Sequence, residues 1–456
     1  MENVINQSTS KIKGTLFSNT DLRNLIVPLV VEQILVMLVG MIDTIMVSFA
    51  GEAAISGVAL VDMINNLFIT VLSAVATGGA VIVSQYIGSK NTENASLSAS
   101  QLVMSASLIG LIIAAFCFIF RMPMLHLFYG SVEPDVMQAC ATYFLFTLCS
   151  FPFLGLYNAG AAIFRSMQKT NITMIISMIM NIINIIGNYI GVFLLHMGVA
   201  GVAIPTLLSR LIGSILIFIL TTRKGQPIQV RMNSVFSWHP DIIGRIFRIA
   251  VPNGIENGLF MLGKVLVTSI VAMFGTSQIA ANGVSNSLNT IAIVVVTSIN
   301  LAIVTVVGQC IGANEQEQAK YYTKKLMKIS YIATTLLSML VWIALPLLLD
   351  LYDMSGETYH LAYNLILFHN ILAILLHPTS FNLANAIRAA GDVKYTMWVG
   401  ILSMILFRLG CAWLFGVVMG WGIYGVWTAM GADWLGRSIA FVIRYRSGKW
   451  LRFKAI

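Results

Sequence analysis

Long apolar runs separated by short polar segments alternate along the whole chain. An α-helix of about 20 apolar residues spans the hydrocarbon core of a bilayer, so each run predicts a transmembrane helix. Residues 265–314 carry no charged side chain and are too long for one span, so we expect a turn near 275–278 to divide them. The pattern predicts an all-α polytopic membrane protein with twelve transmembrane helices, centred near Val36, Leu72, Ile109, Leu145, Asn184, Ser209, Leu262, Asn289, Thr335, Leu365, Ile405 and Ser438.

Composition agrees with a membrane protein. The 456 residues are 58% hydrophobic and 10% charged, whereas a soluble domain has roughly 45–50% apolar and 25% charged residues. The net charge of +9 comes from basic loops that alternate with acidic ones, so both termini and the central linker are predicted to be cytoplasmic, and no nucleic-acid partner is expected. The basic set includes Lys90, Arg165, Lys169 and residues 223–248, and the acidic set includes Glu52, Glu133, Asp135, Asp350 and Glu357.

An internal repeat relates the two halves of the chain. A shift of 224 residues aligns VPLVVEQILVML (27–38) with VPNGIENGLFML (251–262) without gaps. The same shift aligns QYIG (85–88) with QCIG (309–312), and Gly201 with Gly425. Each half contains six predicted spans, an even number, so the halves share one orientation in the membrane. Two parallel six-helix bundles related by an axis along the membrane normal are the architecture of alternating-access carriers, which indicates a transporter.

The repeat also predicts how the chain is divided. Between a cytoplasmic N-terminal tail (1–22) and a basic cytoplasmic C-terminal tail (446–456), we expect two lobes joined by a cytoplasmic linker (223–245). The first lobe, called the N-lobe, holds spans one to six (23–222), and the second, the C-lobe, holds spans seven to twelve (246–445).

The first predicted span contains two acidic residues, Glu32 and Asp43. A carboxylate at the centre of a span costs about 2.5–3.5 kcal/mol on insertion scales, so it must face protein or a wet cavity. The residues are eleven positions apart, which is three helical turns plus about 20°, so both lie on one face about 16 Å apart. A buried acid near the middle of a span suggests a cation or proton site at Asp43.

Several motifs resemble those of the multidrug and toxic compound extrusion (MATE) family. They are MIDTIMVSFAGEAAISGV, NIINIIGN with GVAGVAIPT, NAIRAAGDVKYTM, and GWGIYGVW with DWLGR. The resemblance extends from about Leu22 to Trp450 and includes the two-half organisation. It implies twelve helices in two lobes around a central cavity, and export of cationic or amphipathic drugs against inward H⁺ or Na⁺.

The resemblance implies a cation or proton site in the N-lobe formed by Asp43, Asn184, Asn188 and Thr206. Where some members have a second acid, this chain has Asn188, which leaves one carboxylate, two amides and a hydroxyl to hold a cation. Proton coupling through Asp43 is therefore at least as well supported as Na⁺ coupling. Apart from the coupling ion, no cofactor is expected.

In the C-lobe the resemblance implies a role for Glu256, which matches an acid on the seventh helix of some members. Lys264 lies about two turns further along the same span. It either forms an ion pair with Glu256 and holds that carboxylate ionised, or is displaced by an incoming organic cation. Asn282 is the third C-lobe residue that we assign to substrate binding or coupling.

Other charged residues within the predicted spans are secondary candidates. Glu32 either takes part in coupling or binds a helix terminus or a base, and Asp62 remains open between a functional and a structural role. Arg408 is also a candidate, although a basic residue here is more typical of structural pairing between helices or with lipid headgroups. The same structural interpretation is given to Arg210, Asp433 and Arg437.

The leading functional hypothesis is a monomeric secondary antiporter of the plasma or inner membrane that exports small organic cations by alternating access. The alternative is a lipid-linked or polysaccharide flippase, which would need a basic cavity that only Lys264, Arg210 and Arg408 could supply. A channel would need a repeated selectivity ring, which two non-identical halves do not supply. An enzyme is not expected, because no catalytic groups converge and the P-loop-like segment 258–265 lacks both the hydroxyl and the preceding strand.

Overall fold

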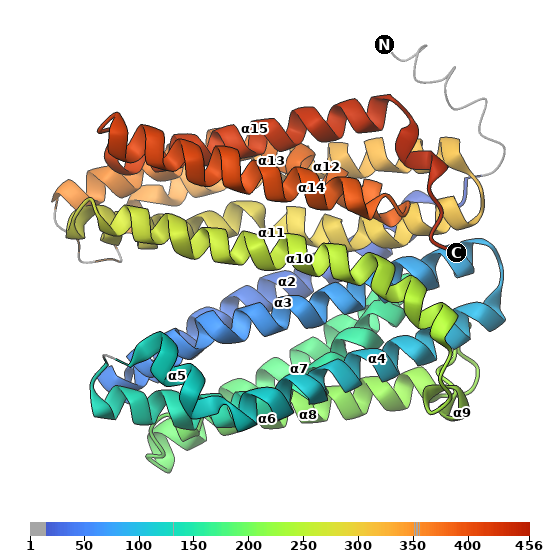
Figure 1. Ribbon diagram of the computed structural model, residues 1–456, viewed down its shortest axis with the longest axis horizontal. Helices are drawn as coiled ribbons and strands as arrows, with labels where there is room; N and C mark the ends of the chain where they lie inside the picture. The colour runs from blue at the N-terminus through green and yellow to red at the C-terminus, as the bar shows by residue number, and fades with distance from the viewer. Residues whose placement is uncertain (1–14, 131, 351, 353, 355) are drawn as a thin grey trace. The chain divides into compact units, whose positions relative to one another are not determined.

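The protein is helical in every regular element that the structure describes. The computed structural model (Figure 1) describes residues 15–130, 132–350, 352, 354 and 356–456, and no β-strand occurs among them. The chain divides into two compact units, one formed by Asp21–Gly254 and the other by residues 15–20 together with Ile255–Ala455. The predicted all-α fold is confirmed.

The first unit contains the helices predicted for the N-lobe, coloured from blue to green in Figure 1. Its long helices are α2 (Asn19–Ser48), α3 (Glu52–Gly88), α4 (Thr92–Ile119), α6 (Pro134–Ser166), α7 (Thr170–Tyr189) and α8 (Ala200–Thr222). The π-helical turn η1 (Ile190–Leu194) prolongs α7. Two short helices that the apolar pattern does not predict, α5 (Arg121–Tyr129) and α9 (Met232–Val235), lie outside the spans.

The second unit repeats this order. It contains most of α10 (Pro240–Ala272), followed by α11 (Thr276–Gly312), α12 (Gln316–Asp350), α13 (Gly356–Ala389), α14 (Val393–Ser403) and α15 (Gly422–Arg446). The π-helical segments η2 (Met404–Gly410) and η3 (Ala412–Val418) continue α14, and the 3₁₀ turn η4 (Lys449–Arg452) follows α15. The π-helical ends of α7 and α14 therefore fall at corresponding places in the two halves.

The turn expected near residues 275–278 is confirmed, and its backbone explains why glycine is present. Gly275 precedes α11 with φ 98°, and Gly51 precedes α3 with φ 106°. Such positive φ values are readily adopted only by glycine. The two helices that follow are each 37 residues long, so the 224-residue repeat found in the sequence is preserved in the local structure.

Eleven helices of the described chain are long and apolar enough to cross a membrane. The twelfth expected span is α15, which has 25 residues and is long enough but carries Asp433 and Arg437 at its centre. These side chains are one helical turn apart and form an ion pair of 2.8 Å. The pair lowers the hydropathy of α15 while shielding both charges from lipid, so the helix belongs with the other spans.

The segments predicted as tails and linker also contain ordered structure. Residues 1–14 of the predicted N-terminal tail lie outside the described chain, but α2 begins within that tail, at Asn19. The first turns of α10 lie within the predicted linker, which also contains α9. In the predicted C-terminal tail, Trp450 is buried and its ring stacks on Tyr445.

Aromatic and aliphatic side chains form a separate core in each unit. In the first unit, Phe144, Leu148 and Phe151 of α6 pack with Val61 and Leu72 of α3. In the second unit, the buried core is formed mainly by α13 and α15, with further side chains from α10, α11 and α12. These central helices hold the flanking ones in place, and the polar side chains considered next lie between α2, α7 and α8, and between α10, α11, η2 and α15.

Candidate functional site

Four residues predicted to form the N-lobe site lie together. Asp43 is near the end of α2, Asn184 and Asn188 are one turn apart on α7, and Thr206 is on α8. The Asn188 Nδ2 atom donates a hydrogen bond of 2.7 Å to Asp43 Oδ1. Asn184 and Asn188 are buried, whereas Asp43 and Thr206 are half-buried.

The Asn184 amide links the acid to the hydroxyl. In the orientation that satisfies both of its ends, its nitrogen donates to Asp43 Oδ1 over 2.7 Å and its oxygen accepts from the Thr206 hydroxyl over 3.1 Å. Both amide nitrogens therefore face the carboxylate. Asn188 Oδ1 is buried and has no hydrogen-bond partner among the described residues, so the site retains one unused oxygen.

Close packing of α7 and its extension against α8 brings these side chains together. A Cβ atom on Gly191 would lie 2.4 Å from the Gly201 carbonyl oxygen, and one on Gly187 would lie 2.6 Å from Pro205 Cβ. Only glycine permits backbones to approach so closely. The glycines thus place Asn184 of α7 within reach of Thr206.

A second acid and a base lie beside this cluster. Arg210 is one turn from Thr206 on α8, donates a hydrogen bond of 2.7 Å to the Ser150 hydroxyl, and interacts electrostatically with Asp43 and Asp62. Asp62 accepts a hydrogen bond of 3.3 Å from Asn65, one turn along α3. Sequence analysis considered Asp62 and Arg210 separately and did not place either of them beside Asp43. The i, i+4 spacing of Thr206 and Arg210 was the one available signal.

Glu32 and Glu256 each form a buried ion pair. Glu32 Oε1 lies 2.6 Å from Arg165 Nη2, and its Oε2 accepts a hydrogen bond of 2.8 Å from Thr173. Glu256 Oε2 lies 2.7 Å from Arg388 Nη2. For Glu32, the predicted contact with a base is observed, and its role in coupling stays a prediction.

The suggested ion pair between Lys264 and Glu256 is wrong. Arg388, from α13, neutralises Glu256 instead, because its guanidinium reaches the carboxylate from the facing helix. The eight-residue offset rotates Lys264 by about 80° relative to Glu256, so Lys264 faces a different neighbour. That neighbour is Arg408, whose positive charge repels that of Lys264.

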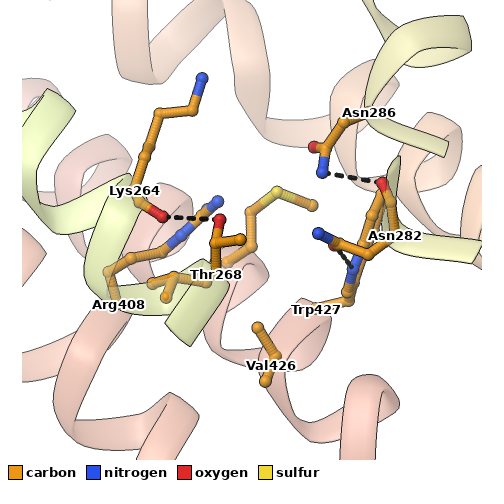
Figure 2. A pocket seen from close by; sticks show the side chains of 9 residues that line it. Lys264, Thr268, Asn282, Asn286, Arg408, Val426 and Trp427 are labelled. Carbon is orange, nitrogen blue, oxygen red and sulfur yellow. Dashed lines mark hydrogen bonds between the residues drawn. The ribbon is translucent and has the colours of Figure 1, made fainter. Parts of the chain in front are cut away.

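Lys264, Asn282 and Arg408 line a common pocket in the second unit (Figure 2). Lys264 and Thr268 come from α10, Asn282 and Asn286 from α11, Arg408 from η2, and Trp427 from α15. Trp427 Nε1 donates a hydrogen bond of 3.1 Å to Asn282 Oδ1. Sequence analysis identified Lys264 and Asn282 as C-lobe candidates and Arg408 as a secondary one. It suggested Glu256 as the partner of Lys264, but Glu256 pairs with Arg388.

Asp433 and Arg437 form an ion pair with each other inside α15, rather than between helices or with lipid headgroups as predicted. Beyond their mutual ion pair, Asp433 accepts a hydrogen bond from Ser403 of α14, and Arg437 donates one of 3.2 Å to the Gly400 carbonyl oxygen. The pair itself lies within α15, and these additional bonds connect α15 to α14. Asp433 Oδ1 takes part in these bonds, whereas the buried Oδ2 has no hydrogen-bond partner among the described residues.

Comparison with known proteins identifies a family. The MatE family model matches residues 28–190 and 252–414, which are corresponding parts of the two halves. The chain is 29% identical over 433 residues to the uncharacterized transporter YisQ of Bacillus subtilis (strain 168), covering 93% of each. It is 24% identical to a probable multidrug resistance protein NorM of Thermotoga maritima, covering 94% of this chain and 92% of that one.

The fold is also found among solved structures. A multidrug resistance MATE family transporter of the MOP superfamily, in an outward-facing conformation, superimposes with a TM-score of 0.87 at 18% identity. The match covers 96% of this chain and all of the other. The helical fold is therefore shared at low sequence identity.

Proposed function

Because the chain belongs to the MatE family, a family of multi-span membrane transporters for small organic compounds, we propose that it is a proton-coupled antiporter that exports cationic or amphipathic compounds. In this proposal Asp43 takes up a proton from outside and releases it inside, while the cargo moves outward. Alternating access follows if proton and cargo each favour a different conformation of the carrier. The coupling ion is the only cofactor proposed.

The observation that carries the proton assignment is the orientation of the two amides. Asn188 and Asn184 both direct N–H groups at Asp43, whereas Na⁺ requires oxygen ligands. Arg210 adds a positive charge that interacts with the same carboxylate. The positive charge opposes both ions, but the orientation of the amides disfavours a bound metal cation relative to a proton, which needs a single carboxylate oxygen.

The location and assembly of the protein complete the proposal. We place the chain in the plasma or inner membrane, with both termini and the central linker in the cytoplasm, because basic side chains gather in the loops on that side. The functional unit is one chain, since each of the two predicted lobes holds its own polar cluster and needs no residue from a partner.

The test is reconstitution in liposomes with a fluorescent organic cation, ethidium, as cargo. A pH gradient alone should drive ethidium transport and a Na⁺ gradient alone should not. Asp43→Asn should reduce pH-driven transport at least ten-fold without changing the thermal unfolding midpoint, because the amide fits the same space but cannot exchange a proton at neutral pH. Full pH-driven transport by Asp43→Asn would contradict the assignment.

Asn188→Asp provides the matched variant for the choice of ion. It places a second carboxylate beside Asp43, which supplies the charge and oxygens that Na⁺ needs. We expect a Na⁺ gradient to drive ethidium transport in Asn188→Asp. A wild-type protein already driven by Na⁺ would refute the proton assignment.

A further inference from the structure

The pocket in the second unit occupies the same place in the repeat as the Asp43 cluster of the first. The 224-residue shift places Val267 at the position of Asp43, Arg408 at that of Asn184, and Met430 at that of Thr206. All three line the pocket, and Figure 2 labels Arg408 among the side chains around it. The same shift pairs Asp62 with Asn286, another lining residue.

The local packing around the two sites is also equivalent. Gly201 in α8 packs against the backbone of Gly191, and its counterpart Gly425 in α15 packs against the backbone of Phe415 and Gly416. The polar residues on both sides of these contacts thus come from corresponding helices. The second pocket is a duplicate of the first site in position, although its chemistry has changed.

The change reverses the charge. The Asp43 and Asp62 carboxylates have been replaced by Val267 and Asn286, and Arg408 has replaced an amide. Lys264 adds a second cation to the pocket. A site that attracts cations in one half has become a site that attracts anions in the other.

The two cations of the pocket lack an acidic partner. Within the described chain, no carboxylate lies within salt-bridge distance of Lys264 or Arg408. Arg408 Nε is buried and makes no hydrogen bond to any described residue. Asp433 interacts electrostatically with Arg408, but its Oδ1 is paired with Arg437 at 2.8 Å, and its buried Oδ2 makes no hydrogen bond to Arg408 or to any other described residue. Arg408 is half-buried and Lys264 is exposed. Basic residues inside a membrane span almost always find a partner or face a water-filled cavity, so this pair points to a ligand that enters the pocket.

The remaining polar groups are also arranged to donate. Because Trp427 occupies Asn282 Oδ1, the Asn282 amide nitrogen is the group that remains for a ligand. Asn286, one turn further along α11, lines the same space; its Nδ2 donates one N–H to the Asn282 carbonyl oxygen over 2.9 Å, which leaves the second N–H for a ligand. The cavity is about 40 Å³, on a measure where one water needs roughly 10–15 Å³. It therefore has room for a head group and not for a whole drug.

We propose that this pocket binds the oxyanion head group, a carboxylate or a phosphate, of an amphipathic organic anion or zwitterion. Lys264 and Arg408 supply the charge, and the amide nitrogens of Asn282 and Asn286 complete the set of donors. The ligand's role as cargo rests on the transport function proposed above, whereas its binding does not. The protein then recognises a negative group in one half and exchanges protons in the other.

The experiment measures equilibrium binding to the purified full-length chain in lipid nanodiscs made of phosphatidylcholine. The probes are dansyl-labelled undecanoic acid and its trimethylammonium analogue, which share the chain and the fluorophore. We expect the carboxylate probe to bind at least ten-fold more tightly than the ammonium probe. Removal of one charged hydrogen-bond partner should weaken carboxylate binding on the order of ten-fold or more, in both Lys264→Gln and Arg408→Gln.

Two further variants keep the test informative if Arg408→Gln fails to fold. Asn286→Asp is nearly isosteric and restores the acid of the first half, so it should weaken carboxylate binding by a similar factor. Lys328→Gln removes an exposed lysine of α12 outside the pocket and should leave binding unchanged. Equal affinity of the wild type for both probes, or unchanged carboxylate binding in Lys264→Gln and Asn286→Asp, would overturn the proposal.

Two more arms identify the source of the anion and separate the two proposals. The first arm repeats the measurement in nanodiscs that contain the anionic lipid phosphatidylglycerol. If the carboxylate probe then binds more weakly to the wild type but not to Lys264→Gln, a lipid headgroup competes for the pocket. If binding is unchanged, the anion is a soluble amphiphile. Asp43→Asn should retain carboxylate binding. Carboxylate binding without gradient-driven transport in the wild type would refute the antiport function and leave the anion site standing.

Discussion

Glu32 and Glu256 stand at equivalent positions of the repeat, and both are neutralised by an arginine from the facing helix. The pairs differ little in distance, at 2.6 Å for Glu32–Arg165 and 2.7 Å for Glu256–Arg388. Recurrence of one ion pair in both halves favours a shared role in holding α2 to α6 and α10 to α13. Asp43 has no such counterpart, because Val267 occupies its place.

A buried ion pair is costly to break at one end. In Glu256→Gln, Arg388 would keep a buried charge without its carboxylate, and we expect the free energy of unfolding to fall by about 3–5 kcal/mol. The measurement is denaturant unfolding of the purified protein in detergent. The double variant Glu256→Gln with Arg388→Met should recover much of the loss, since it removes both charges.

Glu317→Gln is the matched control for that variant. Glu317 and Lys320 are also 2.7 Å apart, but both side chains are exposed, so stability should be unchanged within error. A stable Glu256→Gln protein that has lost transport would show that Glu256 acts in coupling and not in holding the helices together.

Prediction from the sequence succeeded at the residue scale where a local pattern was present. Asn184 and Asn188 fall one turn apart, so their common face could be read from spacing alone, and their proximity to Asp43 came from the family resemblance. The partner of Glu256 could not be predicted, because Arg388 lies 132 positions away and no periodicity connects them. Lys264 was chosen only because it is near in the sequence.

At the scale of elements, the glycines between α7 and α8 determine whether the Asp43 site can form. In Gly201→Ala, the new Cβ would lie 2.6 Å from the Gly191 backbone, and the helices would have to separate. Overpacking of this kind costs about 1–3 kcal/mol. We expect lower thermal stability together with reduced pH-driven transport, measured in the liposome assay.

Gly244→Ala in α10 is the control for the glycine variant, because a Cβ there meets nothing within 4 Å. It should be as stable as the wild type or slightly more so, since alanine favours helix. Equal stability and transport in Gly201→Ala and Gly244→Ala would mean that close packing of α7 and α8 is not needed to build the site.

Elements were predictable where apolar length alone defines them. The spans followed from runs of about 20 apolar residues, and the turn at Gly275 followed from an uncharged stretch too long for one helix. The short helix α5 was missed because nine residues give no span-length signal. Its Leu125 is nevertheless buried in the core of the first unit, a tertiary effect that local patterns do not contain.

At the scale of the whole molecule, the internal repeat explains why two sites of opposite charge occur at equivalent positions of the two halves. A duplicated bundle supplies two equivalent polar positions, and substitution at a few of them changes the ligand without changing the packing. The second half thereby keeps its glycine contacts and its buried Glu–Arg pair while the acid at the site is lost. The sequence showed the duplication directly, but the reversal of charge became visible only when the lining residues were known.

The same duplication fixes the expected topology, because two halves of six spans return the chain to its starting side. Basic loops then lie in the cytoplasm. In a variant without native cysteines, Lys224→Cys in the central linker should react with an impermeant maleimide only in inverted membrane vesicles. Glu133→Cys, which is exposed just before α6, should react only in whole cells. The opposite pattern would reverse the orientation, and would mean that the distribution of lysine and arginine does not set the topology of this chain.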